Sequence, residues 1–435
     1  MDVIRTFGNI IDSQVGSHPL RARRILYAGW RAQLANLTVH ADKRLPAARR
    51  YAARVAMGKI TRALKHPEKA AAISLFTPYE PLQTTGVLPY SVEQLSCFIG
   101  GSDAESAFLE AAAQAGFADT MCSYHRIFLG AAASGLLPRP AFCVYTSLAC
   151  DGNLITFPSV QDHFDIPGFC LDVPFERSDD AVGYVAQEIR DLVRFVEGCI
   201  GQAIDESALR ETVARGWRSA LGYRRFLDAS PGRRLPADMT SEMYAILTNH
   251  VLMGSPETER FCSMLADDME SAPASDGLRL LWLHTMPFSQ EPLIERLNFN
   301  DDVFITANDL AADPMLIDVD PDRPYEAMAR RLVYSCYNGP ASARTERALD
   351  MARRTQAEGA VLFNHWGCRA TLGASQLIKQ DLEEAGLPCL VLDGDGADPA
   401  NRSDGQTSTR FDAFIELLGA KREERAGAAD EGSAR

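Results

Sequence analysis

The sequence predicts an α/β protein with two domains, each built on a parallel β-sheet, joined by a helical segment and preceded by a helical extension. Its 435 residues, 46% of them hydrophobic, are enough for two or three globular domains with large cores. Short apolar runs alternate with helical segments in two separate regions, a pattern typical of βαβ units. Charge is unevenly distributed along the chain. Residues 1–70 are basic, with 14 Lys/Arg against 4 Asp/Glu, whereas the remainder is acidic, with 30 Lys/Arg against 54 Asp/Glu.

The first half of the chain gives the extension and the first domain. Residues 1–68 have helical spacing up to the pair His66-Pro67, and this basic stretch forms the extension. The first α/β domain is expected over 69–195. Its predicted strands are apolar runs with Pro or Gly punctuation, AAAISLF, AFCVYTSLAC and GFCLDVPF, and the crossover between the last two is NLITFPSVQDHF.

The second half repeats this organisation. Residues 196–275 have helical periodicity and form the linking segment, and the second α/β domain is expected over 276–420. The polar tail, 421–435, is expected to be disordered. The predicted strands of the second domain are LRLLWLHTMP, DDVFITA, AVLFNHWGC and PCLVLDGDG, with helices between them. The fold class is therefore two Rossmann-like domains, whose ligands would lie beyond the carboxyl ends of the strands.

Composition excludes several function classes. The net charge of −14 and the acidic body argue against nucleic acid as the main partner. The basic extension could still be a nucleic-acid arm, but its helical spacing favours packing on the acidic body or on a partner subunit. There is no run of about 18 apolar residues and no signal-peptide pattern, so we expect no membrane span and a cytoplasmic location.

The ten cysteines are isolated from one another, and no C-x-x-C occurs. In a reducing compartment they would be thiols that serve as core filler, ligands or nucleophiles. Cys368 follows a polar turn and precedes a helix, whose N-terminus would stabilise a thiolate. Cys122 lies near His125 and Arg126, and Cys97 precedes a Gly-Gly pair. Four others are interpreted as structural, namely Cys143, Cys170, Cys262 and Cys389.

Common catalytic motifs are missing. No GxGxxG follows a strand, and no P-loop, HExxH or GxSxG occurs. The GDG at 394–396, with Asp393, could bind Mg²⁺ or phosphate, but a glycine-rich strand exit explains it as well. Cys122 and His125 could begin a zinc site, although no second pair is evident.

Three stretches carry a resemblance to a known family. They are AVLFNHWGCRATLGASQLIKQDLEEAGLPCLVLDGDGAD near the C-terminus, TTGVLPYSVEQLSCFIGG with MCSYHRIFLGAAASGLLPRP, and YTSLACDGNLITFPSVQDHFDIPGFCLDVPF. Together they resemble the 2-hydroxyacyl-CoA dehydratase family, which includes the benzoyl-CoA reductase subunits. The resemblance implies an iron–sulfur cluster held by Cys97, Cys122 and Cys368, expected to be [4Fe-4S], with a double-cubane [8Fe-9S] cluster as the alternative. Three thiolates would leave one iron open to substrate.

The same resemblance implies a radical reaction. One electron added to the thioester carbonyl of a 2-hydroxyacyl-CoA gives a ketyl that expels the α-hydroxyl, after which the β-proton is acidic enough to leave. The implied partners are an acyl-CoA substrate, a second dehydratase subunit or a second copy of this chain, and an ATP-hydrolysing iron–sulfur activator. Alternatives are an acyl-CoA reductase subunit of the benzoyl-CoA type, a double-cubane cluster reductase, and a non-catalytic scaffold subunit.

Two histidines are predicted to be catalytic. His284 and His365 end predicted strands of the second domain, where the crevice rule places the ligand. An imidazole there could stabilise the ketyl oxygen or carry the β-proton.

Overall fold

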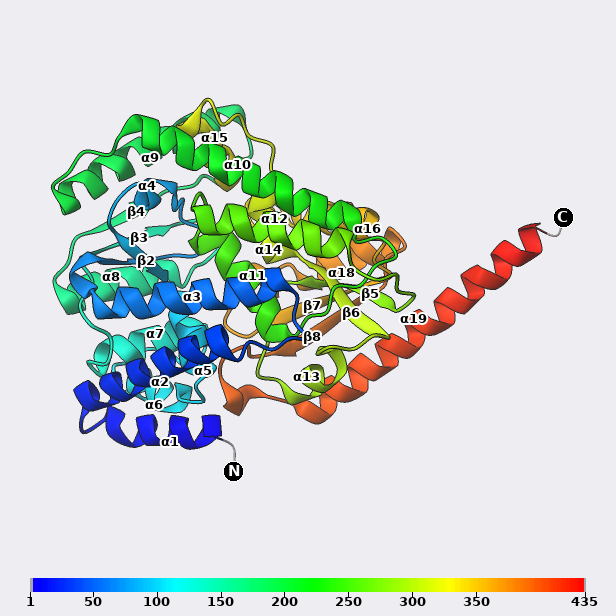
Figure 1. The fold of residues 1–435 in the computed structure, drawn as a ribbon, viewed down its shortest axis with the longest axis horizontal. Helices are drawn as coiled ribbons and strands as arrows, with labels where there is room; N and C mark the ends of the chain where they lie inside the picture. Colours follow the sequence, from blue (N-terminus) through cyan, green and yellow to red (C-terminus); the bar gives the residue numbers. More distant parts are fainter. Residues whose placement is uncertain (1–2, 434–435) are drawn as a thin grey trace.

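Two four-stranded parallel sheets, lying side by side, organise the molecule in the computed structural model, which describes residues 3–433 (Figure 1). The first sheet has the order β2-β1-β3-β4 and the second has the order β6-β5-β7-β8, so the two share the same pattern. The strands are β1 (Ala70–Ile73), β2 (Leu88–Ser91), β3 (Phe142–Thr146), β4 (Gly168–Leu171), β5 (Leu278–Leu283), β6 (Val303–Asn308), β7 (Gly359–His365) and β8 (Cys389–Gly394). This is the predicted fold class of two Rossmann-like domains.

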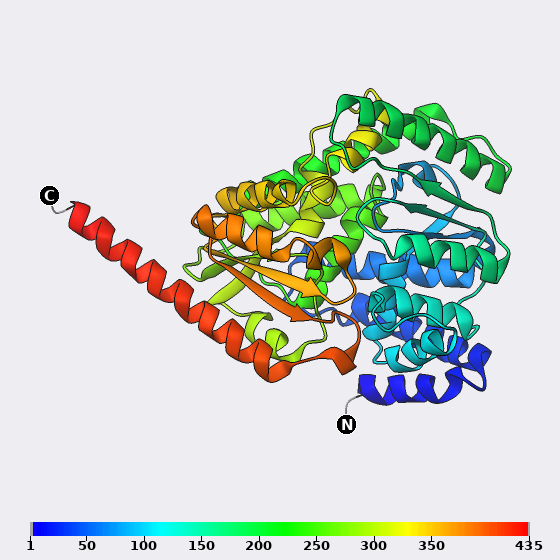
Figure 2. The same ribbon diagram turned by 180° about the vertical axis from the view of Figure 1, so that it is seen from behind.

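Helices cover both faces of each sheet and fill the space between the sheets (Figures 1 and 2). Those before and within the first domain are α1 (Val3–Val15), α2 (Pro19–Val39), α3 (Ala47–Lys65), α4 (Glu80–Gln83), α5 (Val92–Gly100), α6 (Glu105–Gln114), α7 (Ser123–Ala133) and α8 (Asn153–Phe164). The long linking helices are α9 (Asp179–Ile200), α10 (Glu206–Ala229), α11 (Met239–Val251) and α12 (Pro256–Glu270). The second domain has α13 (Glu291–Leu297), α14 (Asp309–Ala312), α15 (Pro324–Val333), α16 (Ala341–Thr355), α17 (Arg369–Leu372), α18 (Ser375–Glu384) and α19 (Asp404–Ser433). Short 3₁₀ turns lie at Pro67–Lys69, Asp313–Met315 and Pro399–Asn401.

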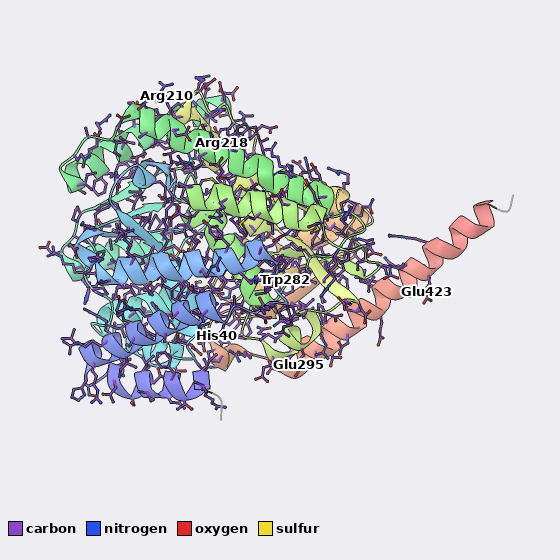
Figure 3. The ribbon with its side chains drawn as sticks, in the orientation of Figure 1. His40, Arg210, Arg218, Trp282, Glu295 and Glu423 are labelled. Atoms are coloured by element: carbon purple, nitrogen blue, oxygen red, sulfur yellow. The ribbon has the colours of Figure 1, made fainter. Side chains whose placement is uncertain are left out.

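The central strands are buried over almost their whole length because both faces of each sheet are covered. All four residues of β1 and all seven of β7 are buried. Trp282 of β5, marked in Figure 3, is fully buried and stacks near Phe363 of the neighbouring strand β7. This dry, close-packed sheet gives the loops at its carboxyl end a rigid base.

The basic extension packs on the body of the protein. Arg49 of α3 forms a buried ion pair with Glu242 of α11, and the Asp268 carboxylate accepts a hydrogen bond from the backbone N–H of Ala48. In α2, the Trp30 indole donates to the Ser102 hydroxyl. The extension therefore meets acidic and polar groups of the body, the arrangement that its helical spacing favoured.

Three features differ from the sequence-based expectations. The tail from 421 onward, expected to be disordered, continues α19 as far as Ser433; residues 434–435 lie outside the described part. Phe411, Phe414 and Leu418 anchor the first half of that helix, and the following Ala, Glu and Arg residues extend it readily. Its far end, near Glu423 in Figure 3, runs away from the body in both ribbon views.

The second and third differences concern β-strands. The strand at Leu88–Ser91 was not expected, because the segment is only four residues long and contains a proline. Cys170, expected in a buried strand run, is exposed because β4 is an edge strand of the first sheet. Among residues 3–433, no helix combines the length and the apolar character that crossing a membrane requires.

Candidate functional site

The loops at the carboxyl ends of the two sheets meet around one buried cavity of about 100 Å³. Residues of both α/β domains and of α11 line it. Its chemically distinctive lining consists of four cysteines, three histidines and one carboxyl group, namely Cys97, Cys122, Cys150, Cys368, His125, His284, His365 and Glu93. The structure thus brings the three predicted cysteines together and adds Cys150, which sequence reasoning had placed at a strand end without giving it a role.

Local structure explains how each thiol reaches the cavity. Cys150 lies in the loop between β3 and α8, and Cys368 follows β7 and is the N-cap of α17. Cys122 is the N-cap of α7. Three of the four thiols therefore lie at or just before helix N-termini, where the helix dipole favours negative charge on sulfur. Cys97 differs, because it lies inside α5.

Two of these loops touch through their backbones. Gly367 has φ of +78°, and a Cβ on it would lie 2.5 Å from the backbone nitrogen of Cys122. Only glycine combines this conformation with so close an approach. The contact sets the spacing between the Cys122 loop of the first domain and the Cys368 loop of the second.

Each of three thiols faces one imidazole. The Nε2 atom of His365 lies 3.3 Å from the sulfur of Cys122, that of His125 lies 3.1 Å from Cys150, and that of His284 lies 3.5 Å from Cys368. These partners come from distant parts of the chain, so only the fold pairs them. Burial lowers the pKa of His125 to about 4 and also lowers the pKa values of His284 and His365, so the three rings are neutral at pH 7.

The thiols themselves are costly to ionise in this cavity. Burial raises the pKa of Cys122 and of Cys150, and the nearby Cys368 sulfur raises both pKa values further. Burial and the Glu93 carboxylate raise the pKa of Cys97. Among the described residues, the cavity lining includes no Lys or Arg. Thiolates here would therefore need a positive charge from a bound group.

His284 occupies a strained position just after β5. Its φ is +83°, which is unusual for any residue other than glycine. The Asp309 carboxylate accepts the His284 backbone N–H at 2.5 Å, and the Asn308 amide donates to the His284 carbonyl at 2.9 Å. Arg344 forms a buried ion pair with Asp309. This support turns the His284 side chain toward Cys368 rather than along the strand.

Glu93 is a site residue that sequence reasoning missed. Its half-buried side chain lies in the cavity wall, and its buried Oε2 atom has no hydrogen-bond partner among the described residues. Burial raises its pKa from 4.5 to about 7. The available signal was an acidic residue in the apolar stretch VEQLSCFIG, since a carboxylate rarely lies in such a helix without a role.

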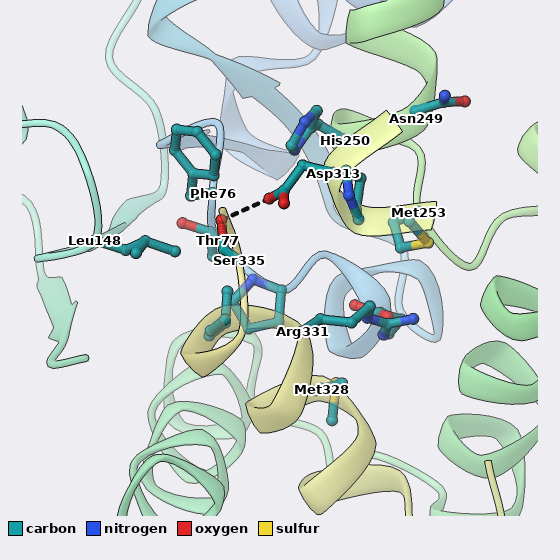
Figure 4. A pocket seen from close by; sticks show the side chains of 14 residues that line it. Phe76, Thr77, Leu148, Asn249, His250, Met253, Asp313, Met328, Arg331 and Ser335 are labelled. Atoms are coloured by element: carbon teal, nitrogen blue, oxygen red, sulfur yellow. Dashed lines mark hydrogen bonds and ion pairs between the residues drawn. The ribbon is translucent and has the colours of Figure 1, made fainter. Parts of the chain in front are cut away.

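A second, smaller pocket adjoins the cavity, and Phe76 lines both (Figure 4). In it, Glu80 and Arg331 form a buried ion pair, and the Ser335 hydroxyl donates to the Asp313 carboxylate at 2.5 Å. Thr77, at a predicted strand end, lines this pocket rather than the cysteine cavity.

The remaining sequence motifs have structural explanations. Asp395 of the GDG turn accepts hydrogen bonds from the Ser123 hydroxyl and from two backbone N–H groups, which fixes the loop after β8. His125 faces Cys150 and not Cys122, so the C-x-x-H spacing does not form a pair of ligands to one ion. Within the described residues, no group of three or more His, Cys, Asp or Glu side chains is arranged to hold a single metal ion. Sulfurs spaced around a cavity instead suit a larger, multinuclear group.

Comparison with known proteins identifies the family of this chain. The family model described as 2-hydroxyglutaryl-CoA dehydratase, D-component, matches residues 74–418. The chain belongs to this family. The match includes all four cavity cysteines and leaves out the whole basic extension.

Three curated relatives are dehydratase alpha subunits. The chain is 25% identical to the (R)-phenyllactyl-CoA dehydratase alpha subunit of Clostridium sporogenes, over 80% of this chain and 88% of that protein. It is 23% identical to the lactoyl-CoA dehydratase subunit alpha of Anaerotignum propionicum, over 78% and 88%. It is 19% identical to the (R)-2-hydroxyisocaproyl-CoA dehydratase alpha subunit of Clostridioides difficile, over 82% and 92%.

Proposed function

We propose that this chain is the cluster-bearing alpha-type subunit of a 2-hydroxyacyl-CoA dehydratase, a hydro-lyase that removes water from a 2-hydroxyacyl-CoA thioester. The observation that carries the proposal is the meeting of three cysteine sulfurs at one buried cavity between the two sheets. Family membership and the names of the relatives support the reaction class. Because those relatives are alpha subunits, we also propose a partner subunit, together with an ATP-hydrolysing iron–sulfur activator as electron donor.

The donor set fits an iron–sulfur cluster, which we take to be [4Fe-4S]. Cys122, Cys150 and Cys368 influence one another electrostatically, and each has a helix N-terminus beside or just after it. Burial raises the pKa values of Cys122 and Cys150, and iron would supply the missing positive charge. Cys97 lies inside α5, whereas the other three thiols lie in loops or at helix N-termini. We therefore assign the third ligand to Cys150, in place of the Cys97 implied by the resemblance.

When bound, such a cluster supplies one-electron chemistry and an open iron that polarises the thioester carbonyl. The chain's own residues do the rest. Apolar side chains of α11 and the Leu75-Phe76 segment line the cavity and exclude water. Glu93, with an unpartnered buried oxygen and a pKa near 7, is suited to move a proton at Oε2. His284 presents Nε2 beside Cys368 and is the second proton-handling group.

Single cysteine-to-serine variants test the ligand assignment. After anaerobic reconstitution, we expect Cys122→Ser, Cys150→Ser and Cys368→Ser to lose most of their iron and acid-labile sulfide, whereas Cys97→Ser retains them. Cys143→Ser, at a buried position within β3, is the matched control. If Cys150→Ser keeps its iron and Cys97→Ser loses it, then Cys97 is the third ligand, as the family resemblance implies. A wild-type protein that binds no iron would refute the proposal.

Product analysis tests the reaction. The reconstituted chain, combined with its partner subunit and an activator, is supplied with a 2-hydroxyacyl-CoA, ATP and a one-electron reductant. We expect the unsaturated 2-enoyl-CoA and water without net consumption of the reductant. A reduced acyl-CoA formed at the expense of stoichiometric electrons would place the chain in the reductase branch instead.

A further inference from the structure

In His365 and His125, the hydrogen bond at Nδ1 indicates whether Nε2, the nitrogen that faces a cysteine sulfur, carries the proton. The Nδ1 atom of His365 accepts a hydrogen bond of 3.0 Å from the backbone N–H of Gly396. A backbone N–H is always a donor, so Nδ1 must hold a lone pair. In the neutral ring the proton is then on Nε2, the atom that faces the Cys122 sulfur.

The surroundings keep His365 in this tautomer. The Asp395 carboxylate lies 3.7 Å from Nδ1, which is too far for a hydrogen bond. Its Oδ1 atom is already engaged by the Ser123 hydroxyl and by the backbone N–H groups of Ala397 and Asp398. The ring is 1% exposed, so water does not compete for Nδ1.

His125 repeats the arrangement on the other side of the cavity. Its Nδ1 atom lies 2.8 Å from the Thr156 hydroxyl, and its Nε2 atom lies 3.1 Å from the Cys150 sulfur. A metal-bound thiolate can only accept a hydrogen bond, so Nε2 must donate and the Thr156 hydroxyl must donate to Nδ1. His284 differs, because its Nδ1 atom is buried without a hydrogen-bond partner among the described residues, and its Nε2 atom, 3.5 Å from the Cys368 sulfur, makes the longest of the three contacts.

We propose that His125 and His365 are positioning residues that donate fixed N–H···S hydrogen bonds to the sulfurs of Cys150 and Cys122 and thereby raise the reduction potential of the cluster. This inference rests on the proposed function. A hydrogen bond to a ligand sulfur stabilises the extra negative charge of the reduced cluster more than that of the oxidised one. His365, predicted from the sequence to be catalytic, is thereby assigned to tuning, whereas His284, which has the longest sulfur contact and no hydrogen bond at Nδ1, keeps the proton-handling role of the proposed function.

The test is a redox titration of the anaerobically reconstituted full chain, followed by electron paramagnetic resonance. We expect His365→Leu and His125→Leu to retain iron and to show more negative midpoint potentials than wild type. His365→Gln and His125→Gln should recover part of the shift, because the glutamine amide can place an N–H near the position of Nε2. His163→Leu, which changes an exposed imidazole of α8, is the matched control and should titrate like wild type.

Thr156 provides a test that leaves every histidine in place. Thr156→Val removes the hydroxyl that fixes His125 and should shift the midpoint in the same direction by a smaller amount, whereas Thr156→Ser should restore it. This pair decides the question if the leucine variants do not fold.

The outcomes separate the two proposals. A wild-type chain that binds no cluster refutes the proposed function. A wild-type cluster whose midpoint is unchanged in the leucine variants, or in Thr156→Val where those do not fold, refutes only the hydrogen-bond inference.

Discussion

The backbone contact at Gly367 gives the sharpest prediction about how the site is assembled. In Gly367→Ala, the added Cβ would lie 2.5 Å from the Cys122 nitrogen and 2.7 Å from its Cα, whereas ordinary contact begins at 3.4 Å. Both obstructing atoms belong to the backbone, so no side-chain rotation can relieve the clash. The Cys122 and Cys368 loops must separate by about 1 Å, taken from the difference between those distances.

The substitution also introduces backbone strain, and a control isolates it. A φ of +78° costs a residue with a Cβ about 1–2 kcal/mol. Gly386 has a similar φ of +85°, but a Cβ there would meet nothing within 4 Å. Gly386→Ala therefore bears the same conformational cost without the clash.

The assay combines stability and cluster content. Urea unfolding of the metal-free protein should show a loss of about 1–2 kcal/mol for Gly386→Ala and a larger loss for Gly367→Ala. After reconstitution, only Gly367→Ala should fall clearly below wild type in iron per chain, because a ligand set displaced by about 1 Å binds its metal poorly. If folded Gly367→Ala holds as much iron as Gly386→Ala, the contact does not set the ligand spacing.

Three further predictions concern buried groups. The pKa of Glu93 is raised from 4.5 to about 7, so its contribution to stability is full below pH 4.5 and is lost as the pH rises through 7. Glu93→Gln should match wild type at pH 4.5 and exceed it by about 3 kcal/mol at pH 9 in urea unfolding of the metal-free chain; a difference independent of pH would contradict this. Cys262→Ala, at a fully buried position in α12, should cost about 1–3 kcal/mol and leave iron content unchanged, and iron loss from folded protein would count against a purely structural role. Arg344→Met should cost about 3–5 kcal/mol because it leaves Asp309 buried without its partner, and adding Asp309→Asn should recover much of that loss if the uncompensated charge is the cause.

The sequence by itself determined the features that depend on local pattern. The apolar runs of β1, β3 and β7 specify buried parallel strands, because a strand covered on both faces must be apolar throughout. The position of Cys368 just after such a run was sufficient to place it at the carboxyl edge of a sheet. The family motifs supplied the reaction class, which no spacing or composition could have indicated.

Only the tertiary structure decided which of these groups meet. The pairing of Cys122 with His365 joins residues 243 positions apart, and Gly367 brings the same two loops into contact. Cys97 lies inside α5, whereas Cys150 leaves β3 toward its sheet's carboxyl edge, and the proposed ligand assignment depends on this difference. In the sequence Glu93 is marked only as an acidic residue in an apolar helix, and the fold places it in the cavity wall. The sequence pattern of a segment predicts its own secondary structure and burial. A functional site depends on distances between segments, and the packing of the two sheets sets those distances.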